Sequence, residues 1–119
     1  MDVRLKRSYE PAAAADGYRV LIDRIWPRGV TRAKAHLDEW ARELAPSTEL
    51  RRWFGHDPAR FEEFRRRYTD ELGSQEGKLR ELRRRAREGT LTLVYSARDT
   101  EHNDAVVLAE ILRRGRRSQ

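Results

Sequence analysis

The chain has 119 residues, a formal net charge of +6 and no cysteine. This length gives room for one domain with one hydrophobic core. The lack of cysteine excludes disulfides, thiolate metal ligands and cysteine nucleophiles. No stretch approaches the roughly 20 apolar residues of a membrane span, and the first residues contain no apolar signal region. The sequence therefore predicts one cytoplasmic domain over residues 1–119, with no membrane contact.

The positive charge by itself says little about a partner. Only three of the 26 basic residues are lysine, and a GC-rich genome produces such an arginine excess without selection for binding. Twenty acidic residues are interspersed with the basic ones and dilute any uniform positive field. Binding to nucleic acid therefore stays an alternative, because composition alone does not decide it.

Two strands are predicted in the first part of the chain. Residues 2–6 alternate apolar and charged side chains, which is typical of a half-exposed edge strand. Residues 8–17 form a loop that is barely long enough for a parallel crossover, so the direction of this first strand stays open. Residues 18–25 contain an uninterrupted Val-Leu-Ile run, which indicates a central strand covered on both faces.

The next segment turns and changes character. Pro27 and Gly29 end the second strand, and Thr31 is a suitable N-cap for a short helix that runs toward Leu37. In residues 37–44 the apolar side chains recur at intervals of three or four, which favours a helix. A short strand is the alternative for this segment.

Helices dominate the second half of the chain. Ser47 caps one that ends at Gly55, and the Asp57-Pro58 pair starts the next. Phe61, Phe64, Tyr68 and Leu72 lie along one face of that helix. A further helix ends at Gly89, residues 90–96 form a second buried strand, and a last helix begins at Asp99 or Thr100. Residues 113–119 form a basic frayed tail. Strands separated by helices predict an α/β fold with a single small, mostly parallel sheet flanked by helices.

Ligands of open parallel sheets collect at the carboxyl ends of the strands. Both buried strands end in polar clusters, which converge if the strands are parallel neighbours. Arginines there suit phosphate or carboxylate oxygens through bidentate contacts. The candidate ligand-binding residues are Asp23, Arg24, Arg28, Tyr95, Arg98 and Asn103. Asp99 and His102 are candidates for acid–base catalysis, because an imidazole titrates near neutral pH.

Structural roles compete with each of these assignments. Asp23 and Arg24 also suit an ion pair at the strand end, and Asp99 and Asn103 are ordinary helix caps. His102 also fits a solvated surface position. No pair of histidines has helical ligand spacing and no cofactor-binding motif is present, so the sequence predicts neither a metal site nor a cofactor.

Three long segments carry a family resemblance: DGYRVLIDRIWPRG, LDEWARELAPSTELRRWFGHDPARFEEFRRRY and TLVYSARDTEHNDAVVLAEIL. The chain resembles the YeaO-like bacterial proteins, the DUF488 family, over nearly its whole length. Such proteins are often labelled MarR-type transcription regulators. These residues do not support that label, because a winged helix needs a β-hairpin wing and the last strand here is followed by one helix.

These observations leave three hypotheses. The leading one is a domain that binds a small anionic, phosphorylated or nucleotide-like molecule through Arg24, Arg28 and Arg98. The second is a nucleic-acid-binding protein that uses the arginine-rich helix face from Arg80 to Arg87. The third is a protein-interaction module without a ligand. Whether the chain is an enzyme is left open.

Overall fold

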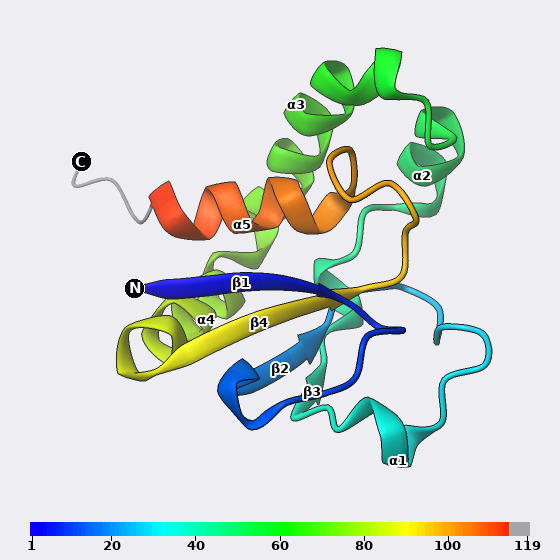
Figure 1. Ribbon diagram of the computed structural model, residues 1–119. Helices are drawn as coiled ribbons and strands as arrows, with labels where there is room; N and C mark the ends of the chain where they lie inside the picture. Colours follow the sequence, from blue (N-terminus) through cyan, green and yellow to red (C-terminus); the bar gives the residue numbers. More distant parts are fainter. Residues whose placement is uncertain (115–119) are drawn as a thin grey trace.

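A four-stranded sheet forms the middle of the computed structural model, which describes residues 1–114. Its strands lie in the order β1-β4-β2-β3 and every neighbouring pair is parallel (Figure 1). The predicted α/β class is therefore confirmed. In chain order the strands and α-helices are β1 (Asp2–Arg7), β2 (Tyr18–Leu21), α1 (Arg32–Ala35), β3 (Glu39–Trp40), α2 (Thr48–Phe54), α3 (Phe61–Leu72), α4 (Glu76–Glu88), β4 (Thr90–Tyr95) and α5 (Asp104–Arg114). Short 3-10 turns cover residues 14–16, 42–44, 58–60 and 73–75.

Strand β4 is the centre of the sheet. It pairs with β1 on one side, where Leu93 lies opposite Leu5, and with β2 on the other, where Leu93 lies opposite Val20. Both β1 and β2 therefore run in the same direction without being neighbours, which answers the question that the loop of residues 8–17 left open. Branched and aromatic side chains fill β4, as its sequence predicts.

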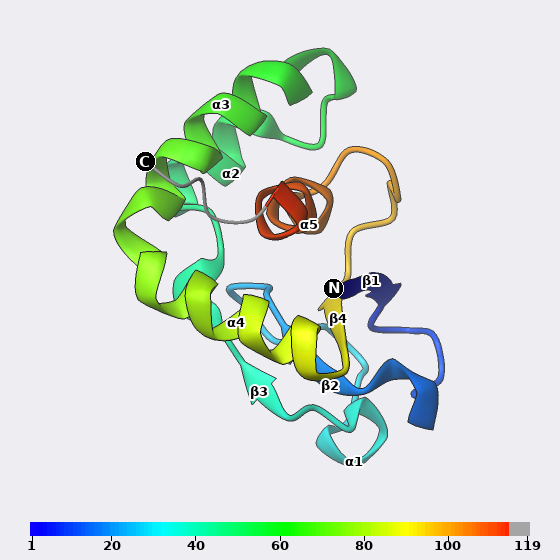
Figure 2. The same ribbon diagram turned by 90° about the vertical axis from the view of Figure 1, so that its left-hand side faces the viewer.

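Helices α2 to α5 cover one face of the sheet. Helices α4 and α5 pack directly on β1 and β4, α3 packs on α5, and α2 packs on α3 (Figures 1 and 2). The predicted apolar stripe of α3 is confirmed, since Phe61, Phe64, Tyr68 and Leu72 are all buried. Burial of each such side chain stabilises the folded state by about 1.5–3 kcal/mol.

Among the described residues, no helix has both the length and the apolar character that a membrane crossing requires.

The opposite face of the sheet is small and is built around a buried ion cluster. Arg19 of β2 is 3% exposed and donates to Asp16 at 2.6 Å and to the carbonyl oxygen of Ala35 at 2.8 Å. Lys6 of β1 lies 3.1 Å from the same carboxylate. Hydrogen bonds from the Ala13 N–H, Lys6 and Arg19 outweigh burial and lower the pKa of Asp16. The cluster thus joins β1, β2 and the end of α1.

Glycine is required where the chain enters β2. Gly17 has φ +64°, and a Cβ atom built there would lie 2.3 Å from the carbonyl oxygen of Thr90. No side chain fits such a contact with backbone, and the left-handed φ also favours glycine. The start of β2 is therefore fixed closely against β4.

Three sequence predictions about element boundaries are wrong. Residues 37–44 are not a helix: Glu39 and Trp40 form the edge strand β3, because the backbone there pairs with β2. Strand β2 ends at Leu21 rather than residue 25, because this pairing and the β4 ladder end there. Helix α5 begins at Asp104, several residues after the predicted cap.

The predicted basic tail is only partly within the described residues. Arg113 and Arg114 belong to α5, and Arg113 Nη2 donates to the carbonyl oxygen of Val3 at 2.6 Å. The rest of the predicted tail, residues 115–119, lies outside the described residues.

Removing the charge of the buried cluster is expected to destabilise the protein. The substitution Asp16→Asn leaves Arg19 buried without a counter-ion, which typically costs about 3–5 kcal/mol of unfolding free energy. The matched control is Glu88→Gln, which removes the partner of exposed Arg84 and should cost under about 1 kcal/mol. Urea denaturation followed by circular dichroism measures both, and equal losses would contradict a structural role for the cluster.

Candidate functional site

The carboxyl ends of β2 and β4 lie side by side, as the sequence predicts. Leu21 pairs with Val94, and the Ile22 N–H donates to the Val94 carbonyl oxygen at 3.1 Å just beyond β2. Two residues further along the chain from the paired positions, Ser96 Oγ donates to Asp23 Oδ2 at 2.5 Å. Register alone thus brings the two predicted polar clusters together.

The other two strands hold this edge of the sheet in place. Arg7, at the end of β1, donates to the carbonyl oxygens of Ser96 and Ala97 at 3.1 and 2.9 Å. On the opposite side, Trp40 Nε1 of β3 donates to the Asp23 carbonyl oxygen at 2.7 Å. The loops that follow β2 and β4 are therefore anchored from both flanks, which favours a preformed site.

A cavity of about 740 Å³ opens above these loops, between the strand ends and the α2–α3 pair. This volume lies within the range of small-molecule sites. Three arginine-bearing segments contribute to its wall: the loop after β2, helix α2, and the loop after β4. The lining residues are Asp23, Arg24, Ile25, Pro46, Arg51, Arg52, Phe54, His56, Phe64, Ser96, Ala97, Arg98, Asp99, Asn103 and Asp104.

Local sequence explains how α2 reaches the cavity. Ser47 caps the helix by accepting from the Leu50 N–H at 3.1 Å, and its own N–H and hydroxyl donate to Glu71 of α3 at 2.8 and 2.6 Å. At the other end Gly55 and His56 both have positive φ, 54° and 58°, which turns the chain sharply into α3. The helix is thereby tied to α3 at its start and turned back at its end.

Four guanidinium groups face the cavity without a carboxylate partner. Across residues 1–114, neither Arg24, Arg51, Arg52 nor Arg98 takes part in an ion pair. Arg24 is steered by two hydrogen bonds to the Pro46 carbonyl oxygen, at 3.2 and 3.3 Å. Outside the cavity, about half of the arginines among residues 1–114 pair with a carboxylate, as Arg65 does with Glu110.

Carboxyl groups occupy the same cavity. Burial raises the pKa of Asp23, although hydrogen bonds with Ser96 and the charge of Arg51 act in the opposite direction. Burial and the nearby charge of Asp23 raise the pKa of Asp104 to about 7, against a smaller opposing effect of Arg51. Four arginines and three aspartates line the cavity, and Asp104 is only partly ionised near neutral pH, so the cavity has a surplus of positive charge.

The Asp99 loop is a scaffold beside the cavity. The Asp99 carboxylate accepts from the N–H groups of Glu101 and His102 at 2.9 and 3.0 Å and lies 2.9 Å from His102 Nδ1. The Glu101 hydrogen bond contributes most to a lowered pKa of Asp99. His102 does not line the cavity; its ring packs edge-on against Phe61 at 5.2 Å. The two candidate catalytic residues therefore form a pair, of which only Asp99 lines the cavity.

Asn103 and Tyr95 have structural positions. Asn103 is 2% exposed, donates to the Asp99 carbonyl oxygen at 2.8 Å and accepts from the Val106 N–H at 2.9 Å. It is therefore the cap of α5, in place of the predicted Asp99 or Thr100. Tyr95 is buried at the end of β4, and burial raises the pKa of its hydroxyl. Asn103 lines the cavity, whereas Tyr95 does not.

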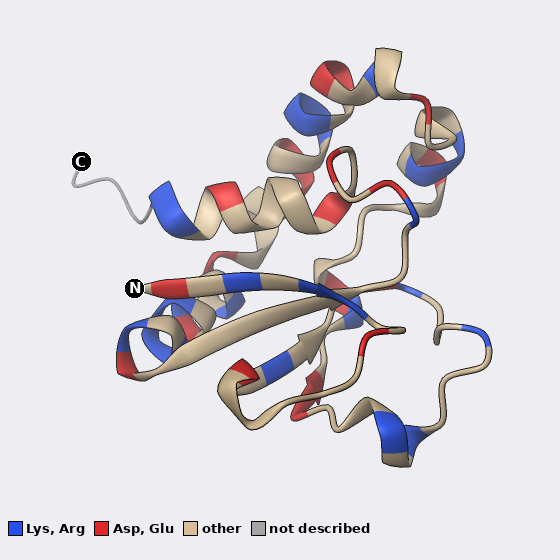
Figure 3. Cartoon of the chain, in the orientation of Figure 1, with Lys and Arg blue, Asp and Glu red and all other residues tan. Residues whose placement is uncertain are grey.

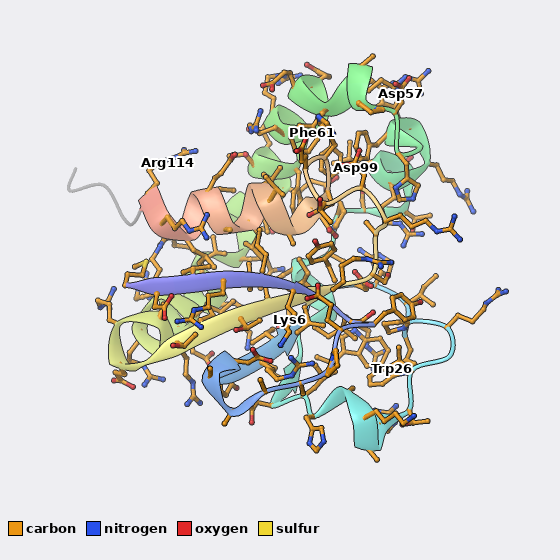
Figure 4. All side chains as sticks on the ribbon, viewed as in Figure 1. Lys6, Trp26, Asp57, Phe61, Asp99 and Arg114 are labelled. Carbon is orange, nitrogen blue, oxygen red and sulfur yellow. The ribbon has the colours of Figure 1, made fainter. Side chains whose placement is uncertain are left out.

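The prediction that Arg28 joins the site is corrected by the structure. Trp26 Nε1 donates to the Val30 carbonyl oxygen at 2.6 Å, and its ring packs on Trp40 at 5.3 Å. These contacts turn the loop toward the α1 side of the sheet, whereas Asp99 lies on the side of α5 (Figure 4). Arg28 follows the loop, is exposed and does not line the cavity.

Sequence reasoning missed Arg51, Arg52 and the part that Asp104 plays. The available signal was an arginine doublet one turn into a short capped helix, within a segment that carries the family resemblance. His56, on the turn before α3, also lines the cavity. Among the described residues, no group of three or more His, Cys, Asp or Glu side chains is arranged to hold a metal ion.

The arginine-rich face of α4 is largely engaged within the protein. Arg83 is 5% exposed and bonds to Glu76 and to the Ile111 carbonyl oxygen. Arg84 pairs with Glu88, and the Arg85 guanidinium lies 4.0 Å from the centre of the Tyr18 ring. Basic and acidic segments alternate along α3 and α4 (Figure 3). This helix therefore offers fewer free cations than its sequence suggests.

A family model described as the inactive DUF488-N3 subclade matches residues 2–119. The chain belongs to the DUF488 family. It is 45% identical over 113 residues to the uncharacterized protein YeaO of Escherichia coli. The matched segment covers 95% of this chain and 98% of that protein. It is 42% identical over 110 residues to the uncharacterized proteins Rv3073c of Mycobacterium tuberculosis and Mb3100c of Mycobacterium bovis, with 92% of each chain covered. No solved structure matches the chain.

The MarR-type label finds no support in the architecture. A winged helix carries a β-hairpin wing, which is antiparallel. Within residues 1–114 every strand pair is parallel, and β4 is followed directly by the Asp99 loop and α5. The family is thus established by the matches, whereas its regulatory label is not.

Titration of Asp104 should appear in the stability of the protein. Burial and the charge of Asp23 after β2 raise its pKa, whereas the backbone N–H groups of Ala105 and Asp104 and the charge of Arg51 of α2 lower it. Because its pKa is about 7 when folded and 3.8 in the reference state, the folded protein binds the extra proton and loses stability as pH rises through this window.

The variant Asp104→Asn should therefore gain stability relative to the wild type between pH 5 and pH 8, by about 2–3 kcal/mol. Thermal melts at both pH values measure the difference. Asp70→Asn, on the exposed side of α3, is the control and should show the same offset at both. An offset for Asp104→Asn that does not change with pH would contradict the raised pKa.

Proposed function

We propose that the chain binds a small anionic, phosphorylated molecule in the cavity at the carboxyl ends of β2 and β4. The observation that carries this proposal is the convergence of Arg24, Arg51, Arg52 and Arg98 on one cavity, without ion-pair partners among residues 1–114. Guanidinium groups bind phosphate and carboxylate oxygens through charge-assisted, often bidentate hydrogen bonds.

Binding rather than catalysis fits the rest of the site best. Of the Asp99–His102 pair, only Asp99 lines the cavity, while the imidazole of His102 packs against Phe61. The matching family model is also described as inactive. An anion-binding module needs only the preformed cavity and its arginines, both of which are present.

Nucleic-acid binding along α4 receives less support. Three of its arginines already contact Glu76, Glu88 or Tyr18. A duplex held by phosphate contacts would show affinity that falls linearly with salt on logarithmic axes, with a slope set by the number of contacts. Fluorescence anisotropy with a double-stranded oligonucleotide, measured across salt concentrations, distinguishes this alternative.

Inorganic phosphate and pyrophosphate should raise the melting temperature of the wild type, because a ligand that binds only the folded state stabilises it by mass action. In Arg98→Ala and Arg52→Ala, the dissociation constant measured by calorimetry should rise by roughly tenfold, the loss of one charged hydrogen bond.

Arg28→Ala is the matched control. Arg28 lies in the same loop as Arg24 and is exposed, but it does not line the cavity. The variant Arg28→Ala should therefore bind phosphate with the affinity of the wild type. If neither anion binds, or if Arg28→Ala weakens binding as much as Arg98→Ala, the proposed site is wrong, and a protein-interaction module becomes the better hypothesis.

A further inference from the structure

The cavity is much larger than a phosphate ion, and its polar wall is divided. Its volume of about 740 Å³ is typical of a whole metabolite. Arg24, Arg52 and Arg98 are exposed residues of the rim, whereas Asp23, Ser96 and Asp104 are partly buried. A ligand that fills this space must therefore present a second kind of group to the carboxyl side.

Asp23 is fixed in position at that side. Its carboxylate accepts from Ser96 Oγ at 2.5 Å, and its carbonyl oxygen accepts from Trp40 Nε1 at 2.7 Å. One hydroxyl donor leaves capacity on the carboxylate, which has two oxygens and about four acceptor sites. Asp104 contributes a second carboxyl group from the first residue of α5.

The charge of Arg51 affects which kind of group those carboxyl groups bind. Arg51 acts electrostatically on both Asp23 and Asp104. The Arg51 guanidinium therefore offsets the attraction that these carboxyl groups would exert on an ammonium group. A hydroxyl group suits all three, because it donates to a carboxylate and accepts from a guanidinium.

We infer that the ligand is a phosphorylated sugar, whose hydroxyl groups bind Asp23 and Asp104 while its phosphate binds the arginines at the rim. This inference rests on the proposed function. A carboxylate that receives ribose hydroxyl groups is a recurring device in nucleotide sites at strand ends. The sugar phosphate is either free or part of a nucleotide, whose base would have the apolar wall of Ile25, Pro46 and Ala97 beside it.

Matched ligands test the hydroxyl contacts. Glycerol 3-phosphate and n-propyl phosphate have the same carbon chain and differ by two hydroxyl groups. Calorimetry on the wild type should show glycerol 3-phosphate, and ribose 5-phosphate with it, binding at least about tenfold more tightly than propyl phosphate. A site built to bind hydroxyl groups rejects the analogue that lacks them, because its polar groups are left unpaired.

The variants Asp23→Asn and Asp104→Asn should bring this ratio close to one, while Asp70→Asn leaves it unchanged. Asp70 is exposed on α3 and outside the cavity. Retained binding of inorganic phosphate shows that a variant is folded. If phosphate and propyl phosphate bind the wild type as tightly as glycerol 3-phosphate, the proposed function stands and the sugar inference is overturned.

Two further ligands complete the test. Tighter binding of O-phosphoethanolamine than of glycerol 3-phosphate would overturn the inference in favour of an ammonium group. Adenosine monophosphate separates the two sources of a sugar phosphate: affinity about tenfold above that of ribose 5-phosphate identifies a nucleotide, and equal affinity a free sugar phosphate. If none of the phosphates binds, including inorganic phosphate, both the proposed function and this inference fail.

Discussion

The pairing of β4 with a parallel strand on each side is the constraint on which the rest of the structure depends. Because all neighbouring strands are parallel, their carboxyl ends lie at the same edge of the sheet. The register that places Leu21 opposite Val94 then brings Asp23 to Ser96 without any further device. A shift of this register by one residue would turn the side chains of one strand to the wrong face and separate the two polar clusters.

The two faces of the sheet are stabilised by different means, and the site depends on both. On the helical face the aromatic stripe of α3 packs beneath α2, which holds Arg51 and Arg52 above the strand ends. On the other face, the ion cluster of Asp16, Arg19 and Lys6 accompanies the buried side chains of Leu21, Val94 and Ala35. Since Arg19 belongs to β2 and Lys6 to β1, this cluster supports the same strands from below.

Sequence patterns predicted the fold well where one interaction dominates. The α3 stripe and the β4 run are long and consistent, so local preference and tertiary packing agree there. The prediction of a helix over residues 37–44 is wrong. The spacing of apolar residues there fits a helix, but pairing of the backbone with β2 favours a strand. Pairing between strands is a long-range interaction that a local pattern does not contain.

The site was predictable in outline for a similar reason. Parallel sheet topology is enough to bring Asp23, Arg24, Arg98 and Asp99 to one edge, and all four line the cavity. Topology does not say which way a loop turns after its strand. Trp26 decided the position of Arg28 by packing on Trp40, and the ties between Ser47 and Glu71 decided that of Arg51. Both contacts join residues that are far apart in the sequence.

The charge arrangement of the cavity opposes stability, which is an argument for function. The ionised carboxylate of Asp104 is less stable in the folded protein, buried beside Asp23, than in water, as its raised pKa of about 7 indicates. Four arginines line the same cavity, and none of them pairs with a carboxylate among residues 1–114. Folding alone gives no reason to place several arginines and several aspartates around one cavity. A ligand with a phosphate at one end and hydroxyl groups at the other would satisfy both groups at once, which relates the unfavourable features to a single cause.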